Sequence, residues 1–184
     1  MRTGAHVGVR DTRRIVGEYV LTVEDAREGA EFEDVVARKY GAIDANQLFI
    51  GEMHSGFAYP YRSLLPVRIE NLLAAGRCGS ATFLGHAAGK SMGNMMALGQ
   101  AAGTAAALCS SRDVSPRDIY RDQISELQQI LLKNDQSIPG IVNEDPDTVA
   151  AVILEPICNT GGMITPTDEY FQILRDICTR HNVL

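Results

Sequence analysis

The feature that most constrains this chain is a run of small residues between Asn71 and Leu108, in which glycine and alanine dominate. Its second half, GNMMALGQAAGTAAAL, has the composition of a helix, because alanine has the strongest helix preference of all residues. Such a helix carries little side-chain bulk, so another backbone or a flat ligand can approach it closely. The sequence predicts a parallel-sheet fragment, with a helix over residues 91–109 packed on a short strand at Asn71–Ala75.

Two uses of this small-residue helix agree equally well with its sequence. One is structural, because Gly99 and Gly103 would let a neighbouring element pack tightly against the helix. The other is binding, because the unpaired N–H groups of a helix N-terminus attract an anion. Gly93 and Asn94 stand where such backbone donors would face a ligand directly. Glycine spacing alone does not separate the two uses.

The remaining sequence up to Pro146 predicts further helices and strands, and hence an α/β fold. Ile15–Thr22 has the composition of a strand, and Thr22 with Asp25 forms a capping pair for a helix. We expect that helix to cover Glu24–Tyr40 with an interruption at Gly29. Residues 43–63 read as a loop with a short strand, whose aromatic residues either bind a ligand or close the edge of a core.

A second long helix is predicted after the small-residue helix. Ser115 and Pro116 provide an N-cap and a first-turn proline, and the helix should end near Asn134. Apolar residues follow at helical spacing and should form its buried stripe, namely Tyr120, Ile124, Leu127 and Leu131. Residues 138–140, Ile-Pro-Gly, then predict a turn.

Charge and cysteine content exclude several classes of function. The net charge of −6 gives no electrostatic support for binding nucleic acid. The four cysteines are widely separated and form no CxxC pair, which favours reduced thiols in a cytoplasmic protein. The histidines are equally scattered, so no metal site is predicted. The run from Met92 to Cys109 contains polar residues and does not predict a membrane span.

The chemistry of the chain changes after Pro146. Residues 1–143 carry 15 basic and 16 acidic side chains, whereas residues 144–184 carry 2 and 7. Val149–Leu154 is an uninterrupted apolar run, typical of a strand buried on both faces of a parallel sheet. After a glycine turn, Thr167 should cap a helix, and Val183-Leu184 should begin another strand. These features predict two units, residues 1–146 and residues 147–184, the second being a βα unit.

The first unit resembles FAD-dependent oxidoreductases of the glutathione-reductase and fumarate-reductase superfamily. The resemblance is strongest over Asn71–Leu108, where a strand ending in Ala-Gly precedes a histidine-containing loop and a helix ending in GQAAGTAAAL. Other signatures occur in family order at Asp11–Tyr19, Pro60–Leu64, Ile138–Gly140 and Asn143–Pro146. The resemblance implies a partial Rossmann-like FAD-binding domain. No GxGxxG turn occurs in the sequence, so we expect the chain to lack the amino-terminal half of such an enzyme.

The resemblance also implies a set of site residues. Those expected to contact FAD are Gly76 and Arg77 by the ribityl chain, and Gly93, Asn94, Met95 and Met96 by the flavin pyrimidine. His86 and Lys90 fall on a loop expected to face the flavin, and we take them as the catalytic pair. Lys90 stands where many relatives have arginine, and a lysine cannot clamp a carboxylate with two parallel bonds. His86 has a structural alternative as a hydrogen-bonded core histidine, and Arg62 is expected to be an ion-pair partner.

Residues 147–184 resemble a different family, the class III aminotransferases that use pyridoxal phosphate. The resemblance rests on a strand running into Glu155-Pro156, the Gly161-Gly162 turn and the sequence LRDICTRHNVL. It maps Glu155 to an active-site position, although a plain strand-end carboxylate is the alternative. This segment contains no lysine, so it cannot bind pyridoxal phosphate covalently.

Three hypotheses of function follow. The first is the carboxy-terminal part of an FAD-dependent oxidoreductase joined to an aminotransferase-like piece, acting on a small-molecule substrate and weak or inactive alone. The second is a fragment of a pyridoxal-phosphate transaminase. The third is a non-enzymatic α/β module that forms homo-oligomers through exposed strand edges and apolar faces.

Overall fold

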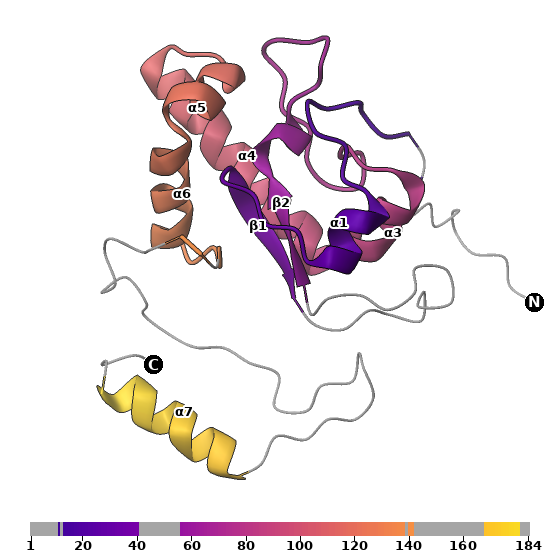
Figure 1. Ribbon diagram of the computed structural model, residues 1–184. Helices are drawn as coiled ribbons and strands as arrows, with labels where there is room; N and C mark the ends of the chain where they lie inside the picture. The colour runs from indigo at the N-terminus through magenta and orange to yellow at the C-terminus, as the bar shows by residue number, and fades with distance from the viewer. Residues whose placement is uncertain (1–10, 12, 41–55, 139, 142–167, 181–184) are drawn as a thin grey trace, which may run out of the picture.

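The computed structural model describes residues 11, 13–40, 56–138, 140–141 and 168–180. The elements from α1 to α6 pack around a two-stranded hairpin that is flanked by helices (Figure 1). In chain order the elements are α1 (Val23–Glu28), β1 (Val35–Tyr40), β2 (Gly56–Pro60), the 3-10 helix η1 (Tyr61–Leu64), α3 (Phe83–Gly89), α4 (Met92–Arg112), α5 (Pro116–Asp122), α6 (Ile124–Lys133) and α7 (Asp168–Arg180). The predicted mixed α/β class is confirmed.

The first helix is shorter than the sequence predicts. Thr22 and Asp25 form the expected capping box, in which each side chain accepts a hydrogen bond from the other residue's backbone N–H. Gly29 does not interrupt the helix but ends it, because its left-handed φ of 69° turns the chain away. The continuation to Tyr40 is wrong, since Val35–Tyr40 is strand β1.

The hairpin is antiparallel, whereas the sequence predicted a parallel-sheet fragment. β1 pairs with β2 from Val35 opposite Pro60 to Tyr40 opposite Gly56, with an irregularity between Val35 and Ala37. All five residues of β2 are buried. The outer edge of β1 is also covered, because Gln128 of α6 donates hydrogen bonds to the carbonyls of Glu33 and Val35, while Gln136 donates to Val36.

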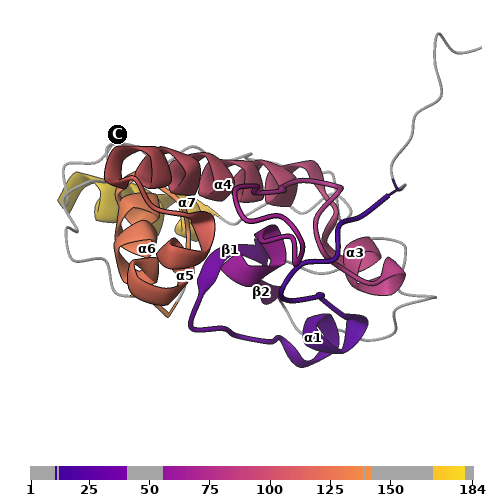
Figure 2. The same cartoon turned by 90° about the horizontal axis from the view of Figure 1, so that it is seen from above.

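The small-residue helix is confirmed as α4, but its packing partner differs from the expected one. α4 lies along the hairpin and contacts β1, with α5 and α6 beside its carboxyl-terminal half and α3 at its other end (Figure 2). Its buried residues recur at helical spacing: Leu98, Ala101, Ala105 and Leu108. The strand expected at Asn71–Ala75 is wrong. That segment is irregular and has one backbone hydrogen bond in the described structure, from Ala74 N to Leu64 O.

The second predicted helix is correctly placed but divided. Ser115 caps α5 with a capping box to Asp118, and Pro116 lies in the first turn. Gln123, with a φ of −135°, leaves the helical region and separates α5 from α6. On the predicted stripe, Leu127 and Leu131 are fully buried in the core.

The strand predicted at Ile15–Thr22 is wrong: the segment has only isolated bridges at Gly17 and Leu21, with a bend at Glu18 and Tyr19 between them. Its backbone follows the loop that leads into α3, through hydrogen bonds from Ile15 N to Cys78 O and from Leu21 N to Ser80 O. Thr82 N returns a bond to Leu21 O at 2.8 Å. This contact fixes the start of α3 against a distant part of the chain.

Only one of the predicted elements of the second unit lies within the described residues. α7 at Asp168–Arg180 confirms the helix predicted after Thr167. The strand at Val149–Leu154, Glu155, the Gly161-Gly162 turn, the Thr167 cap and the strand start at Val183-Leu184 lie outside the described residues.

Candidate functional site

The candidate site lies where the loop before α3, the helix α3 and the first turn of α4 meet. Gly76 begins this loop with a φ of 89°, a conformation that favours glycine, and accepts a hydrogen bond from Gly79 N at 3.0 Å. Arg77 follows at the turn and is half-buried. Gly76 therefore has the role of a turn residue, and Arg77 stands at the tip of that turn.

His86 lies in helix α3, not on a loop as expected. Thr82 caps α3 by accepting a hydrogen bond from Gly85 N at 3.1 Å. Gly85 is tightly held, because an added Cβ would lie 2.4 Å from Leu21 O. The His86 side chain is 5% exposed, and its Nε2 atom has no hydrogen-bond partner. His86 is thus buried, as a core histidine would be, but its Nε2 atom lacks the hydrogen bond that this alternative requires.

The electrostatic surroundings of His86 keep its imidazole neutral. Burial lowers its pKa from the ordinary value, and the nearby cations Lys90, Arg14 and Arg77 lower the pKa further. Asp11 acts in the opposite direction. His86 therefore offers a neutral ring nitrogen at neutral pH.

Lys90 forms the C-cap of α3 and is paired with a carboxylate. Its Nζ atom lies 3.5 Å from Asp11 Oδ2, and the two side chains are 16% and 15% exposed. Arg14 bonds the other carboxylate oxygen of Asp11 and also donates to Ala81 O at 3.0 Å. Our sequence reasoning assigned Asp11 no role at the site, and no local pattern could have placed it beside Lys90.

The junction of α3 and α4 is held by two hydrogen bonds to one carbonyl. Gly89 O accepts from Tyr59 Oη at 2.8 Å and from Asn94 Nδ2 at 2.8 Å. A Cβ on Gly89 would lie 1.8 Å from the Tyr59 hydroxyl, so this position requires glycine. Burial raises the pKa of Tyr59, which stays a neutral donor. Because the Asn94 side chain is bonded to Gly89 O, Asn94 could contact a ligand through its backbone N–H group.

The amino terminus of α4 is open. Its N-cap, Ser91, makes no side-chain hydrogen bond, and its first turn contains no acidic residue. Gly93 is exposed, and an added Cβ would meet no atom within 4 Å. Met92 and Met96 are 75% and 74% exposed. The unpaired N–H groups and the positive end of the helix dipole are therefore accessible at this terminus. A planar group that carries negative charge could bind there.

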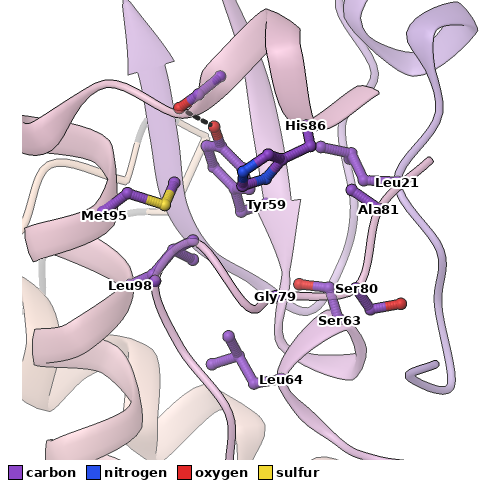
Figure 3. A pocket seen from close by; sticks show the side chains of 12 residues that line it. Leu21, Tyr59, Ser63, Leu64, Gly79, Ser80, Ala81, His86, Met95 and Leu98 are labelled. Atoms are coloured by element: carbon purple, nitrogen blue, oxygen red, sulfur yellow. Dashed lines mark hydrogen bonds between the residues drawn. The ribbon is translucent and has the colours of Figure 1, made fainter. Parts of the chain in front are cut away.

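A small cavity lies behind this surface, and Figure 3 shows the His86 ring entering it beside Tyr59. Its volume of about 20 Å³ accommodates roughly one water molecule. Gly76, His86 and Met95 all contribute to its lining. Of the predicted site residues, Gly76, His86 and Met95 line the cavity, while Gly93 and Met96 lie at the open start of α4. Lys90 pairs with Asp11, Asn94 bonds the α3–α4 junction, and Arg77 stands at the turn after Gly76.

Comparison with known families assigns most of the chain to one family. Residues 1–131 match the family described as FAD dependent oxidoreductase. The chain belongs to this family. The match includes every predicted site residue, the Lys90–Asp11 pair and the open start of α4. The first turn of α4 fits the cofactor that the family name implies. It contains no acidic residue, and its unpaired backbone N–H groups could donate hydrogen bonds to a flavin.

The chain is also similar, over short segments, to curated aminotransferases and to an aminomutase. A hypotaurine/taurine–pyruvate aminotransferase of Paracoccus denitrificans is 46% identical over 44 residues, which is 24% of this chain and 10% of the relative. A probable aminotransferase of Mycobacterium tuberculosis is 50% identical over 50 residues, 27% of this chain and 11% of the relative. A glutamate-1-semialdehyde 2,1-aminomutase of Chlorobium phaeobacteroides is 35% identical over 49 residues, covering 27% and 11%. The chain spans about a tenth of these relatives.

No solved structure matches this chain. Among the helices of the described residues, none combines the length and the apolar character needed to cross a membrane. The described residues also contain no cluster of three or more side chains that could hold a metal ion.

Proposed function

We propose that residues 71–109 form one wall of an FAD site in a hydride-transfer enzyme. The amino terminus of α4, at Gly93–Met96, lies against the flavin pyrimidine in this proposal, and Gly76 with Arg77 lies along the ribityl chain. The family match supports FAD as the cofactor. The observation that carries the proposal is the uncapped α4 terminus, where Gly93 leaves the backbone bare.

FAD, when bound, supplies a hydride acceptor for a substrate carbon. The protein's share is to position a small-molecule substrate and to hold charge. His86 would contact that substrate through its unpartnered Nε2 atom, which can accept a hydrogen bond in the neutral ring. Lys90, fixed by Asp11, contributes a positive charge at the end of α3.

The test is a titration of the purified chain with FAD, followed by flavin fluorescence and thermal unfolding. We expect saturable binding that raises the melting temperature, because a ligand bound only to the folded state stabilises it. Gly93→Leu should weaken binding at least tenfold, since its side chain would fill the space over the helix terminus. Gly99→Leu is the matched control, because it is an exposed glycine of the same helix six residues away.

Two outcomes contradict the proposal. One is the absence of FAD binding at any accessible concentration. The other is equal binding by the two leucine variants, which would move the flavin away from the α4 terminus. Binding should be weak even in the wild type, because residues 1–184 contain no GxGxxG turn to hold the pyrophosphate. For the same reason we expect little or no turnover by the chain alone.

A second candidate function concerns the tail, and the aminotransferase relatives support it. We propose that residues 147–184 form a separate aminotransferase-like unit joined near Pro146. Because this segment contains no lysine, we expect no absorbance band of lysine-bound pyridoxal phosphate after incubation with that cofactor. Appearance of the band would favour the aminotransferase hypothesis.

The third candidate is a non-enzymatic role in self-association. Within the described hairpin, β2 is buried and the outer edge of β1 is bonded by glutamines, so those strands offer little free edge. The exposed Met92 and Met96 side chains provide an apolar surface instead. A mass that rises with protein concentration in light scattering would favour this role.

A further inference from the structure

The amino-terminal segment brings a charged residue, Asp11, to the candidate site. Asp11 approaches Lys90 to 3.5 Å, although the two residues are far apart in sequence. The carboxylate is mostly buried, and its Oδ2 atom accepts no hydrogen bond. The Lys90 ammonium is therefore the partner of this buried oxygen by ion pairing rather than by a hydrogen bond.

The neighbouring Nε2 atom of His86 is the other buried polar atom of this site without a hydrogen-bond partner. The charged groups that influence His86 are three cations, Arg14, Arg77 and Lys90, and one carboxylate, Asp11. Arg14 already bonds the Oδ1 atom of Asp11, which leaves Oδ2 directed to the Lys90 side. Lys90 follows His86 by one turn of α3, so the Asp11 carboxylate that pairs with Lys90 brings a negative charge to the same end of the helix.

We propose that Asp11 is a positioning residue for the catalytic pair: its carboxylate holds the Lys90 ammonium one helical turn beyond His86 and balances the cations that surround the imidazole. This inference rests on the proposed function for its meaning in catalysis. In physical terms, a proton that reaches Nε2 would create a cation among three others. The Asp11 carboxylate lowers the free energy of that state by Coulomb attraction, which is strong where water is excluded.

A purely structural role for Asp11 makes a different prediction. If the carboxylate only ties the amino-terminal segment to α3, its loss would destabilise the fold without changing the acidity of His86. If it acts as a positioning residue, its loss would change the proton affinity of the imidazole. The measurement must therefore report the pKa of His86 itself.

The experiment is an NMR titration of the histidine ring signals in the full chain without FAD. The His86→Gln variant assigns the His86 signal by its disappearance. In Asp11→Asn we expect the pKa of His86 to fall by about one unit, because an unopposed cluster of cations disfavours protonation. In Lys90→Met the pKa should rise by about half a unit or more, because one cation is removed.

Two further variants make the test specific. Asp11→Glu keeps the charge and should leave the pKa of His86 within about 0.3 of the wild-type value. Glu31→Gln removes a carboxylate that pairs with Arg38 elsewhere on the surface and should leave it unchanged. If Asp11→Asn fails to fold, Asp11→Ser, which also removes the charge, takes its place with the same expected fall in the pKa of His86.

A pKa of His86 that stays constant in Asp11→Asn, or falls equally in Asp11→Glu, would overturn the proposal. The titration uses the protein without FAD, so its outcome is independent of flavin binding. Failure of the FAD titration would leave the charge relation of Asp11 and His86 intact, and the reverse also holds.

Discussion

At the scale of single residues, the strongest polar contact of the described structure joins Arg62 to Asp34. Arg62 donates from Nε and Nη2 to the two carboxylate oxygens at 2.9 and 3.0 Å, and its backbone N–H adds a third bond. The guanidinium also lies 5.4 Å from the ring centroids of Tyr19 and Tyr120. The prediction that Arg62 is an ion-pair partner is confirmed.

Loss of the Arg62 side chain should destabilise the fold strongly. Asp34 is only 2% exposed, so Arg62→Met would leave a buried carboxylate without its partner, at a cost of about 3 kcal/mol. The matched control is Arg112→Met, whose partner Glu126 is exposed, with an expected cost below about 1 kcal/mol. Urea unfolding of both variants measures the difference, and equal costs would contradict this account.

The buried His86 should make the fold sensitive to acid. Its pKa is lowered in the folded state, so the unfolded state binds the proton more tightly. Stability contributed by the neutral ring is therefore complete above the unfolded pKa of about 6.5 and declines as the pH falls below it. One proton changes the free energy of unfolding by at most about 1.4 kcal/mol per pH unit.

Urea midpoints between pH 7.5 and 5 measure this loss. In His86→Gln, which has no titrating ring, the decline over the same range should be shallower. An identical pH profile for the variant and the wild type would show that His86 is not the group responsible.

At the scale of elements, α4 contains glycines that the described fold does not need. An added Cβ at Gly99 or Gly103 would meet no atom within 4 Å, and both residues are exposed. Glycine in a helix interior costs about 0.5–1 kcal/mol relative to alanine. Gly99→Ala and Gly103→Ala should each stabilise the chain by that amount, as a rise in melting temperature would show.

Gly89 is the contrasting control at the end of α3. A methyl group there would collide with the Tyr59 hydroxyl, so Gly89→Ala should lower the melting temperature. If all three alanine variants behaved alike, the distinction between packed and open glycines would be wrong.

The sequence predicted elements best where local chemistry defines them. The capping residues Thr22 and Ser115 correctly placed the starts of α1 and α5, because each cap bonds a residue three positions away. β1 was missed because its structure depends on β2 and on Gln128 and Gln136, which lie 93 and 100 residues beyond their partners in β1. The site follows the same rule: the local run identified the α4 terminus, but only folding brings Asp11 to Lys90.

At the scale of the whole molecule, the described hydrophobic core belongs to the first unit. Among the described residues it extends from Leu21 to Ile138 along the chain, and Cys178 of α7, although buried, is not part of it. A chain ending at residue 141 should therefore unfold with the same urea midpoint as the full chain, and with the same FAD affinity. A large loss of stability on truncation would contradict the proposed boundary near Pro146.

The hydrogen bonds from Gln128 and Gln136 to β1 can form only long after β1 itself has been synthesised. Val36 is translated one hundred residues before Gln136, whose side chain bonds its carbonyl. At about 5–20 residues per second, this interval lasts about 5–20 s. Throughout it the outer edge of the strand is unprotected on the nascent chain. Slow translation of the segment after α6 should therefore increase aggregation, even though in the finished molecule two glutamine side chains bond the carbonyls at the start of this strand.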